Sequence, residues 1–98
     1  SARDTYTMER EDKAGTGYVD FIFYPNNGKD DCIILELKAG STAEEAIKQI
    51  KDRNYALKFQ GKLGEEPKYT GRILAVGIAY DRKTKKHQCV VEPLRGKM

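Results

Sequence analysis

Two short apolar runs with a helix-like segment between them constrain the fold of this chain more than any other feature. The runs are Cys32 to Lys38 (CIILELK) and Arg72 to Tyr80 (RILAVGIAY), and each has apolar residues on both of its alternating faces. Runs of this kind are typical of strands that are covered on both sides. A strand, a crossover helix and a second strand form a parallel pair with a right-handed connection. The sequence therefore predicts an α/β fold, with a mixed β-sheet and a crossover helix on one face.

The segment between the two runs has the start signal and the spacing of a helix. Ser41 and Thr42 are each followed three residues later by a glutamate, Glu44 and Glu45, which is the pattern of a capping box. The residues that then fall on one helical face are Ala43, Ala46, Ile47, Ile50, Asn54 and Leu57. We expect a helix from Thr42 to Phe59.

Two further strands extend the sheet at its sides. Tyr18 to Tyr24 (YVDFIFY) is aromatic and β-branched, and the turn signal Pro25 to Gly28 predicts a hairpin into the first apolar run. Asp81 to Thr84 is a second turn signal and leads into a last strand, His87 to Glu92. The predicted order is strand, strand, helix, strand, strand.

Length and composition indicate one domain, residues 1–98. The chain has 98 residues, 39% of them hydrophobic, which supplies one modest core. It opens on Ser1 and Ala2 instead of Met, so we expect a piece of a longer protein. Residues 1–17 are polar and are expected to be a flexible lead-in or an incomplete first element. The second face of the sheet needs a cover, which we expect from an upstream segment or from a second copy of the chain in a homo-oligomer.

Cysteine, histidine and hydropathy patterns argue against several classes of protein. Cys32 and Cys89 each lie in an apolar run without a CxxC pair, so we expect two small buried hydrophobes in a reducing compartment. His87 is the one histidine, which argues against a zinc site and against a Ser-His or Cys-His nucleophile. No apolar run approaches a membrane span and no signal pattern opens the chain. We expect a soluble cytoplasmic domain with no membrane contact.

Charge is distributed unevenly along the chain. Residues 1–50 hold 6 basic and 10 acidic side chains, whereas residues 51–98 hold 12 basic and 5 acidic ones. One half could hold cations and the other attract phosphates, but on composition alone ordinary solvated faces are the better explanation. The basic turn residues Lys83, Lys85 and Lys86 could follow a nucleic-acid backbone. Basic turns are as often simply exposed to solvent, with no role in binding.

Period-two alternation brings three charged residues to one face of the predicted hairpin. Glu36 and Lys38 share a face with Ile34, and Asp20 shares a face with Ile22 on the preceding strand. If the purely apolar faces of the two strands align, Asp20 and Glu36 lie together beside Lys38. Buried charges must be paired or bound to a metal. A plain salt bridge accounts for a lone ExK, but paired carboxylates on neighbouring strands suit Mg²⁺.

These residues resemble the PD-(D/E)XK nuclease superfamily, whose signature is an acid, a spacer and (D/E)xK on adjacent strands. Asp20, Glu36-Leu37-Lys38 and a helix carrying Gln49 match that order. Other motifs look like the branch found at the C-terminal end of bacterial proteins with an AAA-type ATPase-like domain. Those motifs are Arg10-Glu11, Gly17 to Asp20, Ile33 to Lys38, Ala46 to Ile50 with Tyr55, and Gly77 to Tyr80.

The resemblance implies a fold and a role for each matched residue. The fold is a restriction-endonuclease-like core, although the N-terminal helix that normally packs on its sheet is not evident in residues 1–17. Asp20 and Glu36 would bind Mg²⁺ or Mn²⁺, with the Leu37 carbonyl as a third oxygen. Lys38 would orient or activate the attacking water, and Gln49 would support it.

Further candidates have weaker support. Glu11 is the candidate for an additional acid before the first motif strand. Tyr55 could stack on a base or hold Gln49, although a tyrosine at the rim of a helix's apolar face usually belongs to the core. Arg53 could touch a phosphate, although a solvated helix face is the commoner role of such a residue.

The function expected from these features is metal-dependent hydrolysis of phosphodiester bonds in nucleic acid, DNA rather than RNA. An ATPase-like domain in the same full-length chain is the expected partner. The alternative is a non-catalytic binding or assembly module that keeps the nuclease-like fold beside an ATPase. A third reading is a plain α/β protein in which ExK is a surface salt bridge.

Overall fold

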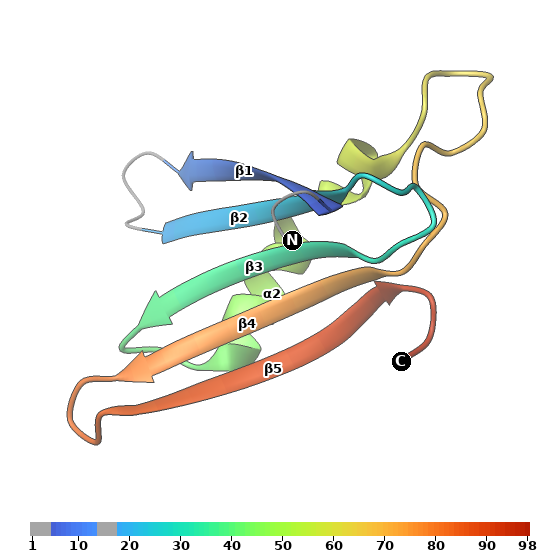
Figure 1. The fold of residues 1–98 in the computed structure, drawn as a ribbon. Coiled ribbons are helices and arrows are strands. Elements are labelled where there is room, and N and C mark those ends of the chain that lie inside the picture. Colours follow the sequence, from blue (N-terminus) through green and yellow to red (C-terminus); the bar gives the residue numbers. More distant parts are fainter. Residues whose placement is uncertain (1–4, 14–17) are drawn as a thin grey trace.

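The computed structural model describes residues 5–13 and 18–98, which form one five-stranded sheet with helical segments on one side (Figure 1). The elements are β1 (Tyr6–Lys13), β2 (Tyr18–Pro25), β3 (Cys32–Ala39), α2 (Ala43–Arg53), the 3₁₀ helix η1 (Tyr55–Phe59), β4 (Ile73–Asp81) and β5 (Lys86–Arg95).

The sheet is mixed, as predicted. Its strands lie in the order β1-β2-β3-β4-β5, and only β3 and β4 are parallel. Helix α2 connects that parallel pair, so the α/β architecture agrees with a restriction-endonuclease-like core. The carboxyl ends of β3 and β4 meet at one edge of the sheet, and the β4–β5 turn lies at the same edge (Figure 1). We call this edge the carboxyl edge.

Strand β1 is an element that the sequence analysis did not anticipate. It pairs with β2 in antiparallel register from Tyr6↔Pro25 to Lys13↔Tyr18. Its central residues are mostly polar, so its sequence gives little of the apolar alternation by which a strand is recognised. Residues 6–13 of the expected lead-in therefore form an edge strand, whereas its residues 1–4 and 14–17 lie outside the described residues.

Helix α2 begins where the capping signal predicted. Thr42 is the N-cap, and its Oγ1 accepts a hydrogen bond of 3.1 Å from the Glu45 backbone N–H. The helix ends at Arg53, not at Phe59, because Asn54 adopts a left-handed conformation with φ 50°. No helix in residues 5–13 and 18–98 is long and apolar enough to cross a membrane.

The break at Asn54 changes which side chains face the sheet. Tyr55 and Phe59 in η1 are buried, whereas Asn54 and Leu57, which we expected on the apolar face, are exposed. The expectation of one continuous helical face was therefore wrong beyond Ile50.

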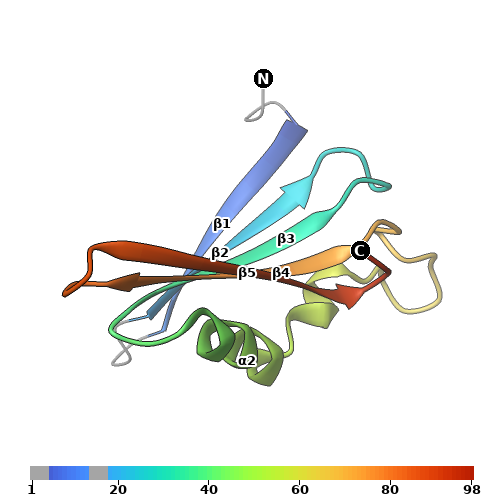
Figure 2. The same ribbon diagram turned by 90° about the horizontal axis from the view of Figure 1, so that it is seen from below.

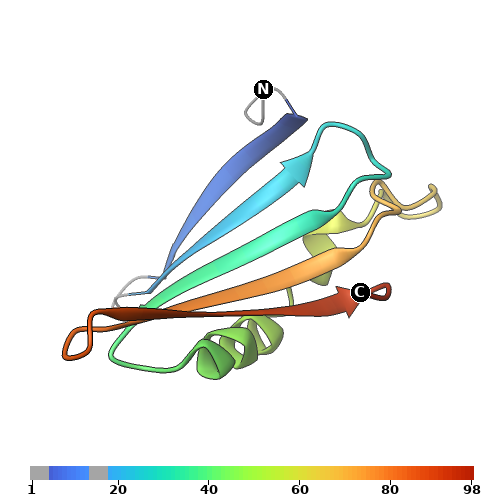
Figure 3. The ribbon, with the colours of Figure 1, turned by 60° about the horizontal axis from the view of Figure 1, so that its bottom comes forward.

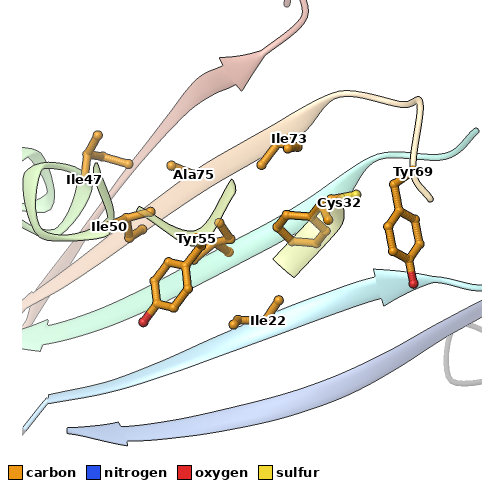
Figure 4. Packing of buried hydrophobic residues seen from close by; sticks show 10 residues of the cluster. Ile22, Cys32, Ile47, Ile50, Tyr55, Tyr69, Ile73 and Ala75 are labelled. Carbon is orange, nitrogen blue, oxygen red and sulfur yellow. The ribbon is translucent and has the colours of Figure 1, made fainter. Parts of the chain in front are cut away.

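The core lies between the sheet and the helical segments (Figure 4). The rings of Phe59 and Tyr24 lie 5.4 Å apart, and Tyr69 meets Phe59 edge to face at 5.8 Å. Gly77 lets α2 approach β4 closely, because a Cβ at this position would lie 2.5 Å from the Ala43 carbonyl oxygen. The members of the core cluster are Ile22, Cys32, Ile34, Ile47, Ile50, Tyr55, Phe59, Tyr69, Ile73 and Ala75.

The opposite face of the sheet, which we call the outer face, carries no helix from residues 5–13 and 18–98 (Figures 2 and 3). It is nonetheless apolar, and its large side chains are partly or mostly exposed, with Leu37 at 45% and Met8 at 56%. Cys89 is exposed there, so the expectation of two buried cysteines holds for Cys32 alone. Both cysteines are free.

The two faces of β3 predict different costs of truncation. Ile34→Ala is expected to lower the free energy of unfolding by about 2–5 kcal/mol, because Ile34 is fully buried. Leu37→Ala is the matched variant on the outer face and is expected to cost about 1 kcal/mol. Urea unfolding followed by circular dichroism measures both. Equal losses would show that the outer face is covered in solution.

Candidate functional site

The hairpin of β2 and β3 places two carboxylates side by side under the helical layer. Asp20 is the register partner of Glu36, and both are fully buried. Lys38, two residues further along β3, is only 5% exposed and lies on the same face. These three are the buried charged residues of the described part of the chain. The predicted convergence of Asp20, Glu36 and Lys38 is therefore confirmed as geometry.

Helix α2 supplies the amide that joins two of these groups. In the orientation that satisfies both neighbours, the Gln49 amide nitrogen donates to Glu36 Oε1 at 3.1 Å. The Gln49 amide oxygen then accepts from Lys38 Nζ at 2.8 Å. Gln49 thus fixes the position of the ammonium group relative to the carboxylate.

Two further side chains reach the carboxylates from the end of the crossover. Arg53 Nη1 donates to Asp20 Oδ2 at 2.5 Å and to Glu36 Oε1 at 2.6 Å, which bridges the two strands. The Tyr55 hydroxyl donates to Asp20 Oδ2. Figure 4 shows Tyr55 within the core cluster. Its ring therefore packs in the core, while its hydroxyl contacts Asp20.

Burial shapes the electrostatics of the site. Desolvation, together with a hydrogen bond to Asp20 and its charge, raises the pKa of Glu36 to about 7, although Arg53 opposes the shift. Desolvation and the neighbouring Asp20 also raise the pKa of Tyr55, which keeps its hydroxyl protonated as a donor. Burial disfavours the charged form of Arg53, but its bonds to the two acids outweigh this and raise its pKa.

Each carboxylate retains one oxygen that the described residues do not satisfy. Asp20 Oδ1 and Glu36 Oε2 are buried and have no hydrogen-bond partner there. Such orphaned acceptors are costly unless a cation or water meets them. Two hard carboxylate oxygens suit Mg²⁺, which commonly uses one or two carboxylates and keeps several waters. The donor set of this site therefore fits the divalent cation that the sequence motif implies.

Glu11 lies next to these acids in the sheet. It is the register partner of Asp20 on β1, so Glu11, Asp20 and Glu36 form a row across three strands. Lys58 from η1 forms an ion pair with Glu11 and another, at 2.8 Å, with Glu9. Residues 5–13 and 18–98 contain no group of three or more His, Cys, Asp or Glu side chains arranged to hold one metal ion.

The basic turn is at the carboxyl edge of the sheet, as is the ExK motif. Lys83, Lys85 and Lys86 are all exposed there. The Asp81 carboxylate caps the turn, because its Oδ1 accepts from the Lys83 backbone N–H at 2.8 Å. A hollow lies between this turn and the loop that leads from β3 to α2, and Arg82 and Lys83 are part of its lining.

The contact of Arg53 with both acids was not predicted from the sequence. Arg53 had been weighed as a phosphate contact or a solvated helix residue, and its contact with nucleic acid stays a prediction. A signal was present, because Arg53 follows Gln49 by four positions and residues so spaced share a helix face. Tyr55 had been weighed as a partner of Gln49, whereas its hydroxyl donates to Asp20.

The raised pKa of Glu36 predicts a pH-dependent stability in the absence of metal. The ordinary pKa of 4.5 applies to the unfolded chain, so the folded state binds the proton more tightly between about pH 4.5 and 7. As the pH rises through this window, the free energy of unfolding should fall by about 3 kcal/mol, and it should level off above about pH 7. Glu36→Gln should remove most of this fall.

Urea unfolding in EDTA at several pH values measures the dependence. Glu92→Gln is the control, since Glu92 is a half-exposed acid paired with Lys51 at the surface. A parent chain whose stability does not change over this range would contradict the raised pKa.

Comparison with known proteins identifies a family for the chain. No curated protein and no solved structure matches the chain significantly. The sequence model of the PD-(D/E)XK nuclease superfamily matches residues 1–90, which include both motif strands and α2. The chain belongs to the PD-(D/E)XK nuclease superfamily.

Proposed function

We propose that this domain hydrolyses phosphodiester bonds in DNA with the help of Mg²⁺ or Mn²⁺. The observation that carries the proposal is the buried pair Asp20 and Glu36, each with an orphaned oxygen, next to Lys38. A stable fold gains little from three buried charged groups on neighbouring strands, because each must be paired at the expense of its hydration. Their position together is better explained by a catalytic role.

Each residue has a distinct task in the proposed reaction. Asp20 and Glu36 hold the cation, and Tyr55 orients Asp20 through its hydroxyl. Lys38 places its ammonium where it can orient the attacking water and offset the charge that develops on the phosphoryl oxygens. Gln49 keeps Lys38 and Glu36 at a fixed separation.

The bound divalent cation would lower the pKa of water and polarise the phosphoryl oxygen. This accounts for a hydrolytic site whose strands and helix carry no histidine beside the acids, since His87 is on the outer face with its ring 4.9 Å from that of Tyr80. Lys38 and the two carboxylates then suffice for positioning and charge compensation.

A wider surface for nucleic acid is proposed at the carboxyl edge. The exposed ammonium groups of Lys83, Lys85 and Lys86 would follow the phosphate backbone, and Tyr55 and Arg53 would lie near the cleaved phosphate. Phosphate contacts of this kind position a duplex without reading its sequence, so we expect weak sequence preference.

The cellular setting is proposed from the resemblance of the motifs quoted above. They are similar to the branch at the C-terminal end of bacterial proteins with an AAA-type ATPase-like domain, so we place this domain beside such an ATPase in the cytoplasm. The alternative function is a non-catalytic binding or assembly module with the same partner. Arg53 favours that alternative to the extent that it already pairs both acids.

Metal binding and cleavage separate these functions. Asp20→Asn should weaken Mn²⁺ binding about tenfold or more in calorimetry, because a direct ligand contributes at least as much as its supporting residues. Lys38→Ala should lower the cleavage rate about 100-fold or more, because its charge acts on the transition state. Single-stranded, duplex and branched DNA, and RNA, are the substrates to compare in Mn²⁺.

Lys62→Ala is the control, since Lys62 is exposed in the loop at the opposite end of the sheet. Mn²⁺ binding without cleavage of any substrate would support the non-catalytic module. Equal cleavage by the parent and Lys38→Ala would assign the activity to a contaminant and overturn the proposal.

The basic turn predicts a loss of salt-dependent binding. Replacing Lys83, Lys85 and Lys86 together by Gln should weaken DNA binding and reduce the salt slope by up to about 3, one for each phosphate contact. Fluorescence anisotropy with labelled duplex at several salt concentrations measures both. The matched control removes the same charge from exposed Lys29, Lys62 and Lys68 at the other end of the sheet. Equal slopes for the two triple variants would contradict the placement.

A further inference from the structure

Arg53 occupies the position that a bridging cation would take between the two acids. Its Nη1 atom alone contacts Asp20 Oδ2 at 2.5 Å and Glu36 Oε1 at 2.6 Å. One nitrogen thus joins carboxylates from two adjacent strands. A metal ion shared by the same two carboxylates would need to approach them closely, and it would repel a guanidinium held there.

Arg53 does not satisfy all the oxygens of the two acids. Asp20 and Glu36 are fully buried, and Arg53 brings a single positive charge to the pair. Arg53 also leaves Asp20 Oδ1 and Glu36 Oε2 without a partner among the described residues. A divalent cation brings two charges and can accept several oxygen ligands. Arg53 therefore leaves two carboxylate oxygens unsatisfied, whereas a divalent cation could meet them.

Arg53 lies outside the hydrophobic core cluster. Its side chain is 18% exposed and belongs to the last residue of α2, next to the exposed Asn54. Tyr55, which also contacts Asp20, is 4% exposed and belongs to the core cluster. Of these two partners of Asp20, the tyrosine is held by core packing, whereas the guanidinium could withdraw without removing a member of the core cluster.

We propose that Arg53 is a resident counter-cation that competes with the divalent metal for Asp20 and Glu36. It keeps the two acids paired in the metal-free protein and must release them when metal binds. Arg53 is thus a positioning residue that sets the metal affinity, and metal binding frees its guanidinium at the mouth of the site. This inference rests on the proposed function, because it assumes that the two acids bind a metal.

Calorimetry with Mn²⁺ tests the competition. Metal-free Arg53→Gln should bind Mn²⁺ about tenfold or more tightly than the parent, because the competing cation is gone. A residue with a merely structural role would change the affinity in the opposite direction or leave it unaltered. Lys51→Gln is the matched control, since it removes the same charge from the same helix but from a surface pair with Glu92. It should bind Mn²⁺ as the parent does.

A second measurement follows metal binding in the parent chain itself. NMR of the arginine side chains during a Mg²⁺ titration should show the Arg53 guanidinium signals shifting or sharpening as the acids release it. Arg72 is the internal control, since it forms a two-point ion pair with Asp31 at 2.6 and 2.9 Å, away from the site. Its signals should stay unchanged. The spectrum of Arg53→Lys assigns the Arg53 resonance by its absence.

The outcomes separate this inference from the proposed function. Equal or weaker Mn²⁺ binding by Arg53→Gln, with clear binding by the parent, overturns the competition and leaves the metal site intact. Arg53 signals that do not change at saturating Mg²⁺ overturn it in the same way. Failure of both the parent and Arg53→Gln to bind Mn²⁺ overturns the metal site and this inference together.

Discussion

The register between β2 and β3 is the constraint on which the site depends. Asp20 lies opposite Glu36 in the same register that sets Ile22 opposite Ile34. A slip of one residue would turn every side chain of β2 to the other face, which would expose Ile22 and remove Asp20 from the site. The hydrophobic pattern that stabilises the hairpin therefore also fixes the distance between the two acids. Stability and the proposed chemistry share one determinant.

The helix side of the sheet is divided into an apolar end and a charged end. Along β3, Cys32 and Ile34 join the core cluster, whereas Glu36 and Lys38 follow at the carboxyl edge. The helical connection serves both ends of this face. Helix α2 supplies Gln49 and Arg53 to the acids and Ile47 and Ile50 to the core, and η1 adds aromatic rings to the core. Tyr55 belongs to both regions and couples the packing of the core to the orientation of Asp20.

The parts of this arrangement that follow from periodicity could be predicted from the sequence. Alternation in β2 and β3 was enough to bring Asp20 and Glu36 together, and the Ser-Thr and Glu-Glu spacing was enough to begin α2 at the right residue. Strand β1 was missed because an edge strand with a mostly polar centre buries too little apolar surface to show a pattern. The end of α2 was missed because a left-handed Asn54 is a single-residue event that helical spacing cannot reveal.

The contact of Arg53 with the two acids could not be predicted from the sequence for a different reason. Helical periodicity assigns a residue to a face, but a long arginine side chain can extend from the rim of that face to groups on a neighbouring strand. Its partners, Asp20 and Glu36, depend on how α2 packs on the sheet, which helical periodicity does not give.

The position of the site on one face has a consequence for the rest of the sheet. The outer face is apolar and carries no helix from residues 5–13 and 18–98 (Figure 2), and Met8, Leu37 and Val91 are among its exposed large side chains. Because side chains alternate across the sheet, a partner on that face would touch Leu35 and Leu37 but would be separated from Glu36 by the backbone of β3. A partner bound on the outer face and a metal ion bound by Asp20 and Glu36 would therefore not collide, although both would contact strand β3.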